Sequence, residues 1–254
     1  CGGMSKSRAM RLLTALILAV WGNAVWAVEC RDEAVGDIDY TICEVDPATE
    51  DLRLFLNDAD GAPLGTFGAV NAQLADQGKI LAFGMNAGMY HDDRSPVGHY
   101  RQDGGDVKDV ILSAGPGNFG LLPNGVFCIG DGRAEVLESN AYAARAGEGC
   151  RDATQSGPML VIDGELHPRF LPDSTSRYIR NGVGVSADGG RVFFAMSQDP
   201  VTFHEFGSLF RDHLKTQQAL YFDGNISRLF APQLGRDDLG LRMGPMVGVV
   251  IPLD

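Results

Sequence analysis

The sequence predicts a single α+β domain whose core is a mixed or antiparallel β-sheet with a few helices. Short apolar runs bounded by Gly, Pro, Asn and Asp recur along the chain and are typical of strands. Helical patterns are scarce, and strands do not alternate regularly with helices as a doubly wound sheet requires. No repeat, charge run or Pro-rich linker divides residues 28–254, so we expect them to form one domain.

The individual elements follow from these runs. The clearest helical segments are residues 69–77 and 204–214, the second with apolar side chains three or four positions apart. The other runs are short and end at turn-forming residues, which predicts strands. These strands cover residues 41–45, 52–56, 80–85, 98–101, 110–112, 126–129, 159–162, 183–186, 192–196, 219–222 and 247–251.

The composition suits a globular domain and excludes several classes of protein. Hydrophobic residues make up 44% of the 254 positions, which is enough for a full core. Acidic residues outnumber basic ones by 33 to 21, which gives a formal charge of -12. Such a surface repels phosphate backbones and anionic head groups, so a nucleic-acid partner is not expected. Nothing in the sequence indicates a protein partner.

Residues 1–27 have the pattern of a secretory signal peptide behind a short leading extension. Three basic residues precede the apolar run 12–21, and a small-residue cleavage site ends at Ala27. The apolar run is about half of the roughly 20 residues that a membrane-spanning helix needs, which argues against a permanent anchor. We therefore expect cleavage after Ala27, a secreted, periplasmic protein, and no stable membrane insertion after the signal is removed.

Export changes the interpretation of the cysteines, because an oxidising compartment turns thiols into disulfides. Beyond the leading extension the chain holds Cys30, Cys43, Cys128 and Cys150, which allow three pairings. We favour Cys30 with Cys43 and Cys128 with Cys150, since each pair closes a short loop between predicted strands. No Cys-x-x-Cys is present and no His stands at a suitable distance from a Cys, so no metal site is predicted.

Several catalytic and cofactor motifs can be tested and set aside. Residues 115–120 have the spacing of a dinucleotide-binding loop, but Pro123 and a turn follow where that motif needs a helix. The chain contains no Gly-x-Ser-x-Gly elbow. Ser156 is a conceivable nucleophile only if His91 or His167 folds against it. The sequence therefore predicts no cofactor.

Polar residues stand beside four apolar strands, at turns made tight by glycine. A strand end fixes the position of a side chain, and the adjacent glycine lets a ligand approach the backbone. Turn formation alone also explains each segment taken singly. The segments are Asn86-Ala87-Gly88-Met89-Tyr90, Gln155-Ser156-Gly157-Pro158, Arg180-Asn181-Gly182 and Asp223-Gly224-Asn225.

The order and the residue sequences of these segments resemble those of the phosphodiester glycosidase family, in its secreted bacterial branch. This family includes the lysosomal uncovering enzyme, which removes N-acetylglucosamine from a sugar phosphodiester. Seven matched segments in order span most of residues 80–250. They are Asn86-Ala87-Gly88-Met89-Tyr90, Pro96-Val97-Gly98, Gly117-Asn118-Phe119, Pro123-Asn124-Gly125-Val126-Phe127, Ala153-Thr154-Gln155-Ser156-Gly157-Pro158, Arg180-Asn181-Gly182-Val183-Gly184 and residues 219–224.

The chain departs from the animal branch at two places, and both concern the substrate. Asn86-Ala87-Gly88 stands where that branch has Asn-Gly-Gly, and Asp223-Gly224-Asn225-Ile226-Ser227 stands where it has Asp-Gly-Gly-Gly-Ser. Ile226 adds a branched side chain to a loop that is otherwise rich in glycine. The resemblance therefore leaves the identity of the sugar open.

With this resemblance, the remaining residues suggest a mechanism. Asp223 is the candidate carboxylate for an oxocarbenium-like transition state. Arg180 is the candidate clamp for a phosphate, with Arg177 as a helper, because a guanidinium can bind two phosphate oxygens at once. A departing phosphate is a weak base and hardly needs a proton, so a second carboxyl is not required. Asp199 and His91 are lesser acid/base candidates.

The other candidates would bind the substrate. Asn86 and Gln155 can hydrogen-bond sugar hydroxyls, and the neighbouring glycines offer close backbone approach. We expect Asn86, Gln155, Arg180 and Asp223 to line one cleft. The substrate-binding set is completed by Gly88, Ser156, Gly157 and Gly224.

The sequence thus predicts a secreted hydrolase that cleaves a glycosidic bond in a sugar phosphodiester or a related glycoconjugate. The alternative from another class is a non-catalytic periplasmic carbohydrate-binding protein of the same fold. An acyl hydrolase built on Ser156 is a third, weaker interpretation. In each of the first two cases the partner is a small molecule or a glycan.

Overall fold

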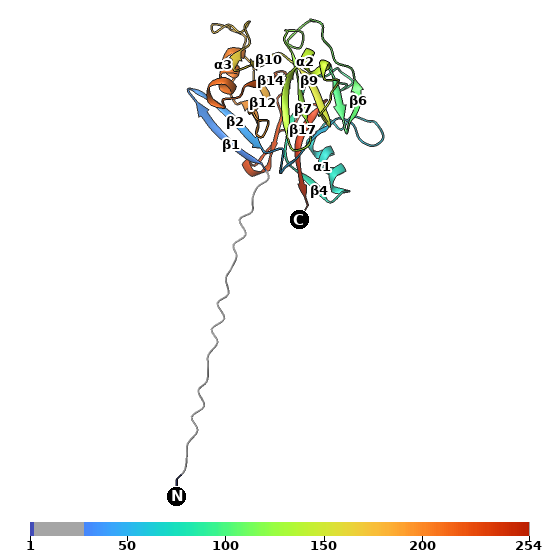
Figure 1. Ribbon diagram of the computed structural model, residues 1–254, viewed down its shortest axis with the longest axis vertical. Helices are drawn as coiled ribbons and strands as arrows, with labels where there is room; N and C mark the ends of the chain where they lie inside the picture. The colour runs from blue at the N-terminus through green and yellow to red at the C-terminus, as the bar shows by residue number, and fades with distance from the viewer. Residues whose placement is uncertain (3–27, 254) are drawn as a thin grey trace.

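Three antiparallel sheets form the body of the protein. The computed structural model describes residues 1–2 and 28–253, so the predicted signal peptide falls almost wholly outside the described residues. Figure 1 shows the strands gathered in one body with the short helices at its margins. Every strand pairing is antiparallel, which confirms the predicted α+β class and settles the choice between a mixed and an antiparallel core.

The largest sheet has seven strands and provides most of the candidate site. Strand β14 lies inside this sheet between β12 and β10, and it carries Asp223 at its end. In spatial order the strands are β1 (Glu29–Val35), β2 (Ile38–Val45), β13 (Val192–Ser197), β12 (Asn181–Val185), β14 (Gln218–Asp223), β10 (Met159–Ile162) and β11 (Glu165–Leu166).

The two other sheets have five strands each. The first, in spatial order, contains β16 (Arg236–Asp237), β15 (Leu229–Ala231), β4 (Lys79–Asn86), β17 (Met246–Pro252) and β3 (Asp51–Phe55). The second contains β6 (Gly105–Lys108), β5 (Tyr100–Gln102), β9 (Asp152–Ser156), β7 (Gly125–Ile129) and β8 (Ala134–Glu138).

The main core lies where the three sheets meet. Phe83 of β4, Phe127 of β7 and Phe194 of β13 pack there with ring centroids 5.0 to 5.7 Å apart. Phe222 of β14 joins them, with its ring 6.3 Å from that of Phe127. Because side chains alternate along a strand, Tyr221 points to the opposite face of β14, toward the helical layer. This alternation decides which side chains of β14 reach the candidate site.

The helices cover the outer faces of the sheets. Helix α1 (Phe67–Ala75) begins at Thr66, whose side chain accepts a hydrogen bond from Ala69 N, and it packs on β4. Helix α3 (Phe203–Ser208) begins with a capping box and runs into a π-helical turn (Leu209–His213) over the seven-stranded sheet. The other two are α2 (Ser139–Ala144) and a 3-10 turn (Pro232–Leu234). Across the described residues, none of these helices has the length and apolar character to cross a membrane.

One predicted strand is wrong. Residues 110–112 form no strand, because the backbone N–H and C=O of Ile111 are both bonded to the side chain of Gln155. The other predicted strands and both predicted helices are present, with ends shifted by a few residues.

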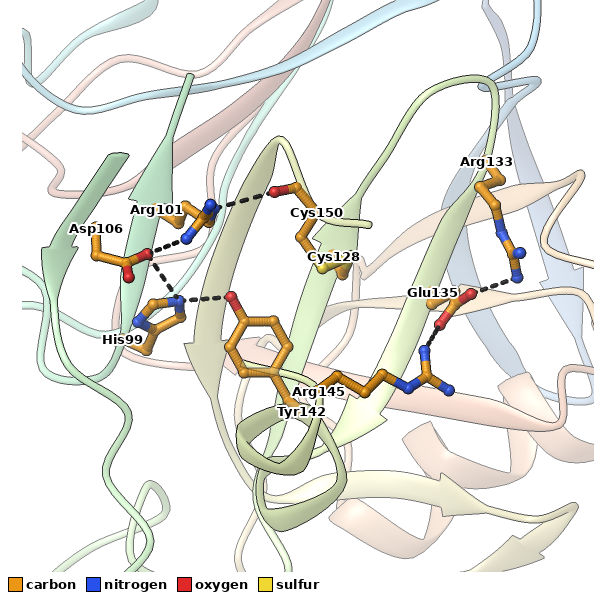
Figure 2. Close-up of a disulfide and its surroundings, with 9 residues drawn as sticks. All are labelled: His99, Arg101, Asp106, Cys128, Arg133, Glu135, Tyr142, Arg145 and Cys150. Atoms are coloured by element: carbon orange, nitrogen blue, oxygen red, sulfur yellow. Dashed lines mark hydrogen bonds and ion pairs between the residues drawn. A yellow bond between two sulfur atoms is a disulfide. The ribbon is translucent and has the colours of Figure 1, made fainter. Parts of the chain in front are cut away.

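Both predicted disulfides are confirmed. Cys30 and Cys43 stand opposite each other on β1 and β2 with their Cα atoms 4.0 Å apart. Cys128 of β7 is joined to Cys150, just before β9, with a Cα separation of 5.4 Å. Figure 2 shows this second disulfide beside α2 and the half-buried Arg101, whose Nε donates to the carbonyl of Cys150 at 3.0 Å. Each disulfide therefore closes a short loop between neighbouring strands.

Removing the second disulfide should lower stability without affecting the candidate site. A closed loop of this size stabilises the fold by about 3 kcal/mol, so Cys128→Ala with Cys150→Ala should lower the free energy of unfolding by that amount. Urea denaturation of the double variant and the wild type would measure the difference. A loss below about 1 kcal/mol would contradict the assignment of a stabilising role to this disulfide.

Candidate active site

Asp223 lies in a cleft formed by loops from four separate parts of the chain. The cleft has a volume of about 580 Å³. Its walls come from the segment after β4, the glycine-rich loop before β7, the segment before β12 and the end of β14. The lining residues are Met89, Tyr90, His91, Val97, Pro116, Gly117, Asn118, Phe119, Ser176, Tyr178, Tyr221, Asp223, Gly224 and Asn225.

The carboxylate of Asp223 is held in place by the turn that follows it. The backbone N–H groups of Gly224 and Asn225 donate to its Oδ1 at 2.6 and 2.9 Å. The residue is 8% exposed. Burial raises the pKa of the carboxyl, and the backbone N–H donors offset part of that rise. The site therefore contains an oriented, largely desolvated carboxylate at the cleft surface.

A pair of buried asparagines ties Asp223 to the neighbouring strands. Asn181 of β12 donates from Nδ2 to Asn86 Oδ1 at 2.5 Å, and its own Oδ1 accepts from the backbone N–H of Asp223 at 3.1 Å. Asn86, at the end of β4, also donates to the carbonyl of Ile226 at 2.8 Å. Asn86 and Asp223 thus come together from different sheets, and Asn181 links them. Asn86 does not line the cleft itself, so its place is beneath the site.

Arg180 is buried behind the cleft wall. Its Nε donates to the carbonyl of Val201 at 2.8 Å and its Nη2 to that of Ser176 at 3.2 Å. The guanidinium carbon lies 3.7 Å from the ring centroid of Phe203, and burial lowers the pKa of the group. Nη1 is buried and has no hydrogen-bond partner among the described residues. The site therefore has a buried cation close to the cleft but not among its lining residues.

Tyr221 separates Arg180 from the cleft. The Tyr221 ring packs edge-on against Phe203, with the centroids 4.8 Å apart, and the guanidinium carbon of Arg180 lies 5.4 Å from the Tyr221 centroid. The hydroxyl lies against Gly224, where an added Cβ would overlap it. Glycine at position 224 therefore leaves room for this hydroxyl at the cleft floor.

Two more predicted residues line or border the cleft. His91 is exposed and lines it. Arg177 lies between the lining residues Ser176 and Tyr178, but its guanidinium forms a 2.7 Å ion pair with Glu205. His91 therefore lines the cleft, whereas the guanidinium of Arg177 is held by Glu205.

The remaining predicted residues serve packing and internal hydrogen bonds. The Gln155 amide accepts from the backbone N–H of His99 and donates to the Ile111 carbonyl and the Ser139 hydroxyl, so it is not available to a sugar. Ser156 is fully buried, and its hydroxyl donates to the carbonyl of Phe222 at 2.9 Å. Neither residue lines the cleft.

The glycines next to these residues, and Asp199, also lie outside the cleft lining. Gly88 has a φ of +151°, and a Cβ there would approach Thr154 Oγ1 to 3.2 Å. A Cβ at Gly157 would lie 2.6 Å from the Cβ of Asn124. Both positions need glycine for close packing. Asp199 accepts a hydrogen bond from the backbone N–H of Asp39, at the start of β2.

Several residues of the site escaped the sequence analysis, although some of them stand inside the segments it singled out. Asn181 follows Arg180, and Tyr221 belongs to the strand that leads to Asp223. Tyr178, which is about half exposed, adds an aromatic surface to the cleft. The sequence could have indicated Tyr221 as a site residue, because it stands two positions before Asp223 and therefore on the same face of the strand.

The cleft offers a limited set of chemical groups. Among the described residues that line it, Asp223 is the single carboxylate, and His91 is the single imidazole. Asn118 and Asn225 add amides, while Tyr90, Tyr178 and Tyr221 add aromatic faces and hydroxyls. Such a set can bind a polar ring compound and stabilise one developing positive charge.

The amino-acid sequence matches a known protein family and a bacterial relative. The profile of the phosphodiester glycosidase family matches residues 80–238, which include every residue that lines the cleft. The uncharacterised protein YigE of Escherichia coli K12 is 33% identical over 230 residues, covering 90% of this chain and 87% of YigE.

Two solved structures share the fold. The catalytic domain of zebrafish N-acetylglucosamine-1-phosphodiester alpha-N-acetylglucosaminidase, auto-inhibited by its pro-peptide, aligns with a TM-score of 0.58 and 12% identity over 87% of this chain and 81% of that chain. A hypothetical protein from Synechocystis aligns with a TM-score of 0.58 and 13% identity. The alignment covers 87% of this chain and 61% of the Synechocystis chain.

Proposed function

We propose that this chain, which belongs to the phosphodiester glycosidase family, is an exported hydrolase that cleaves the glycosidic bond of a sugar phosphodiester or a related glycoconjugate. The observation that carries the proposal is the buried carboxylate of Asp223, the single carboxylate among the described residues that line the cleft. Asp223 is fixed by two backbone N–H donors and lies among aromatic and amide side chains suited to a sugar. The family supports a glycosidase-type hydrolase, and the cleft supports this substrate class.

The proposed reaction needs only one carboxylate. Breaking the bond at the anomeric carbon creates an oxocarbenium-like state, which the negative charge of Asp223 stabilises. Most glycosidases add a second carboxyl group to protonate the leaving group. Asp223 is the only carboxylate among the described residues that line this cleft. A phosphate monoester leaves as a stable anion, so a substrate with that leaving group matches the groups present.

The two disulfides support export to an oxidising compartment, which we take to be the periplasm. Cys30 with Cys43 and Cys128 with Cys150 would not persist in a reducing cytosol. Expression with and without residues 1–27, followed by cell fractionation, tests this location. Retention of the full-length product in the cytosol would contradict it.

A substrate panel tests the proposed activity. The mature protein should release sugar from glycose-1-phosphodiesters and, more slowly, from aryl glycosides with good leaving groups. Asp223→Asn protein, prepared in parallel, provides the control for contaminating glycosidases. Binding of the same sugars without turnover by the wild type would contradict the proposal and favour the carbohydrate-binding alternative.

The pH dependence of activity should reflect the environment of Asp223. Burial raises the pKa of this carboxyl above its ordinary value of 3.8, and only the ionised form can stabilise a positive transition state. Activity should therefore fall as the pH drops through the raised pKa, and the acid limb of kcat/KM should lie above 3.8. A phosphodiester stays ionised throughout this range, so the substrate does not add its own titration. An acid limb at or below 3.8 would contradict the assignment.

A further inference from the structure

The floor of the cleft contains a phenol backed by a buried cation. Tyr221 is about 1% exposed, yet it lines the cleft beside Asp223 and Gly224. Arg180 lies on its other side, away from the cleft lining, with its guanidinium stacked over Phe203. No described carboxylate forms an ion pair with Arg180. A buried guanidinium without a negative partner is costly unless the site receives an anion from outside.

The chemistry of the two groups sets the direction of the Tyr221 hydroxyl. A guanidinium has only donors, so the phenol oxygen can meet Arg180 only as an acceptor. The phenol hydrogen is then directed away from Arg180, and this hydroxyl lies beside Gly224, which also lines the cleft. Burial raises the pKa of Tyr221, so the phenol keeps its proton at neutral pH and remains a donor. A donor polarised by a cation suits an anionic ligand.

We propose that the Tyr221 hydroxyl is the group that binds the phosphate of the substrate, and that Arg180 is the positioning residue that orients and polarises it. This inference rests on the proposed function. It differs from a direct clamp by Arg180, because the guanidinium is buried behind the cleft wall and its two hydrogen-bonded nitrogens hold the carbonyls of Val201 and Ser176. Tyr221 thereby determines specificity for a charged leaving group over a neutral one.

Gly224 gives independent support for this contact. A side chain at position 224 would occupy the space at the Tyr221 hydroxyl. Gly224→Ala should therefore cover or displace the hydroxyl, because the added Cβ would overlap it. This variant should weaken phosphate binding to about the same extent as Tyr221→Phe, which removes the hydroxyl.

The test compares two substrates with the same sugar. Tyr221→Phe removes only the hydroxyl, and kcat/KM should fall by about 10- to 100-fold on a glycose-1-phosphodiester, as expected for a hydrogen bond to a charged group. On the nitrophenyl glycoside of the same sugar it should change by less than about threefold. Arg180→Lys, which keeps a charge but loses the planar stack, should show the same loss of selectivity. An equal loss on both substrates would show a structural role and overturn the proposal.

Tyr142→Phe is the matched control. Tyr142 is another buried tyrosine with a bonded hydroxyl, at 2.8 Å from His99 Nε2, and it lies outside the cleft lining. This variant should leave the selectivity between the two substrates unchanged. A change as large as that of Tyr221→Phe would overturn the proposal.

Binding of inorganic phosphate separates this inference from the proposed function. Phosphate should raise the melting temperature of the wild type, and Tyr221→Phe should weaken its binding by about 10-fold or more. If the wild type hydrolyses no substrate of the panel, the proposed function fails, while this binding measurement still decides the inference. Equal phosphate affinity of the wild type and Tyr221→Phe would overturn the inference alone.

Discussion

Asp223→Asn should reduce kcat by about 1,000-fold or more while leaving the binding of a substrate analogue close to normal. The negative charge acts mainly in the transition state, and an interaction made only there appears in kcat and not in binding. A thousandfold loss corresponds to about 4 kcal/mol of transition-state stabilisation. Steady-state kinetics on a sugar phosphodiester and calorimetric binding of a non-hydrolysable analogue would measure the two effects. Full activity of the variant would rule out the mechanism.

The same substitution should not weaken the fold at neutral pH. The amide oxygen of Asn can accept the same hydrogen bonds from Gly224 and Asn225 that Oδ1 of Asp223 accepts. Because the folded-state pKa of Asp223 is raised, the folded protein binds more protons than the unfolded chain just above pH 3.8. The contribution of Asp223 to stability therefore falls as the pH rises from the pKa that this carboxyl has in the unfolded chain to the higher pKa that it has in the folded protein. An uncharged Asn avoids that penalty, so the melting temperature at pH 7 should stay equal or rise.

The strand ends in the sequence directed attention to Asn86 and Asp223. Asn86 and Asp223 each follow an apolar strand, and the structure brings them together although they come from different sheets. The pattern could not reveal Asn181 as the link between them. A buried asparagine at the start of β12 reads as a turn residue until the register of β12 with β14 is known.

Burial on both faces hid the roles of other residues. β9 (Asp152–Ser156) is fully buried but polar, so it has no apolar pattern to mark it as a strand. In this strand, the amide of Gln155 is hydrogen-bonded to backbone and side-chain partners. The local sequence cannot distinguish this role from sugar binding. The run that contains Tyr221 is apolar throughout, so only the packing of α3 against one face shows which side chains reach the cleft.

The Asn86 network allows a second large effect to be predicted, this time on both stability and turnover. Asn86 is fully buried, and its amide joins Asn181, the carbonyl of Ile226 and the backbone N–H of Arg228. Asn86→Ala leaves these three groups without partners in a dry interior. At about 1 to 3 kcal/mol for each unsatisfied group, the free energy of unfolding should fall by about 3 kcal/mol or more.

Turnover of the folded Asn86→Ala protein should also fall, because Asn181 loses its anchor and holds the Asp223 backbone less firmly. Asn71→Ala is the matched control: the side chain of Asn71 accepts a hydrogen bond from the backbone N–H of Leu81 at 2.8 Å, and Asn71 is not among the residues that line the cleft. It should cost about 1 kcal/mol and leave kcat unchanged. Chemical denaturation and kinetics at a temperature where both variants are folded would compare them. If Asn86→Ala kept full kcat, the asparagine pair would be structural only, and the position of Asp223 would depend on its own turn.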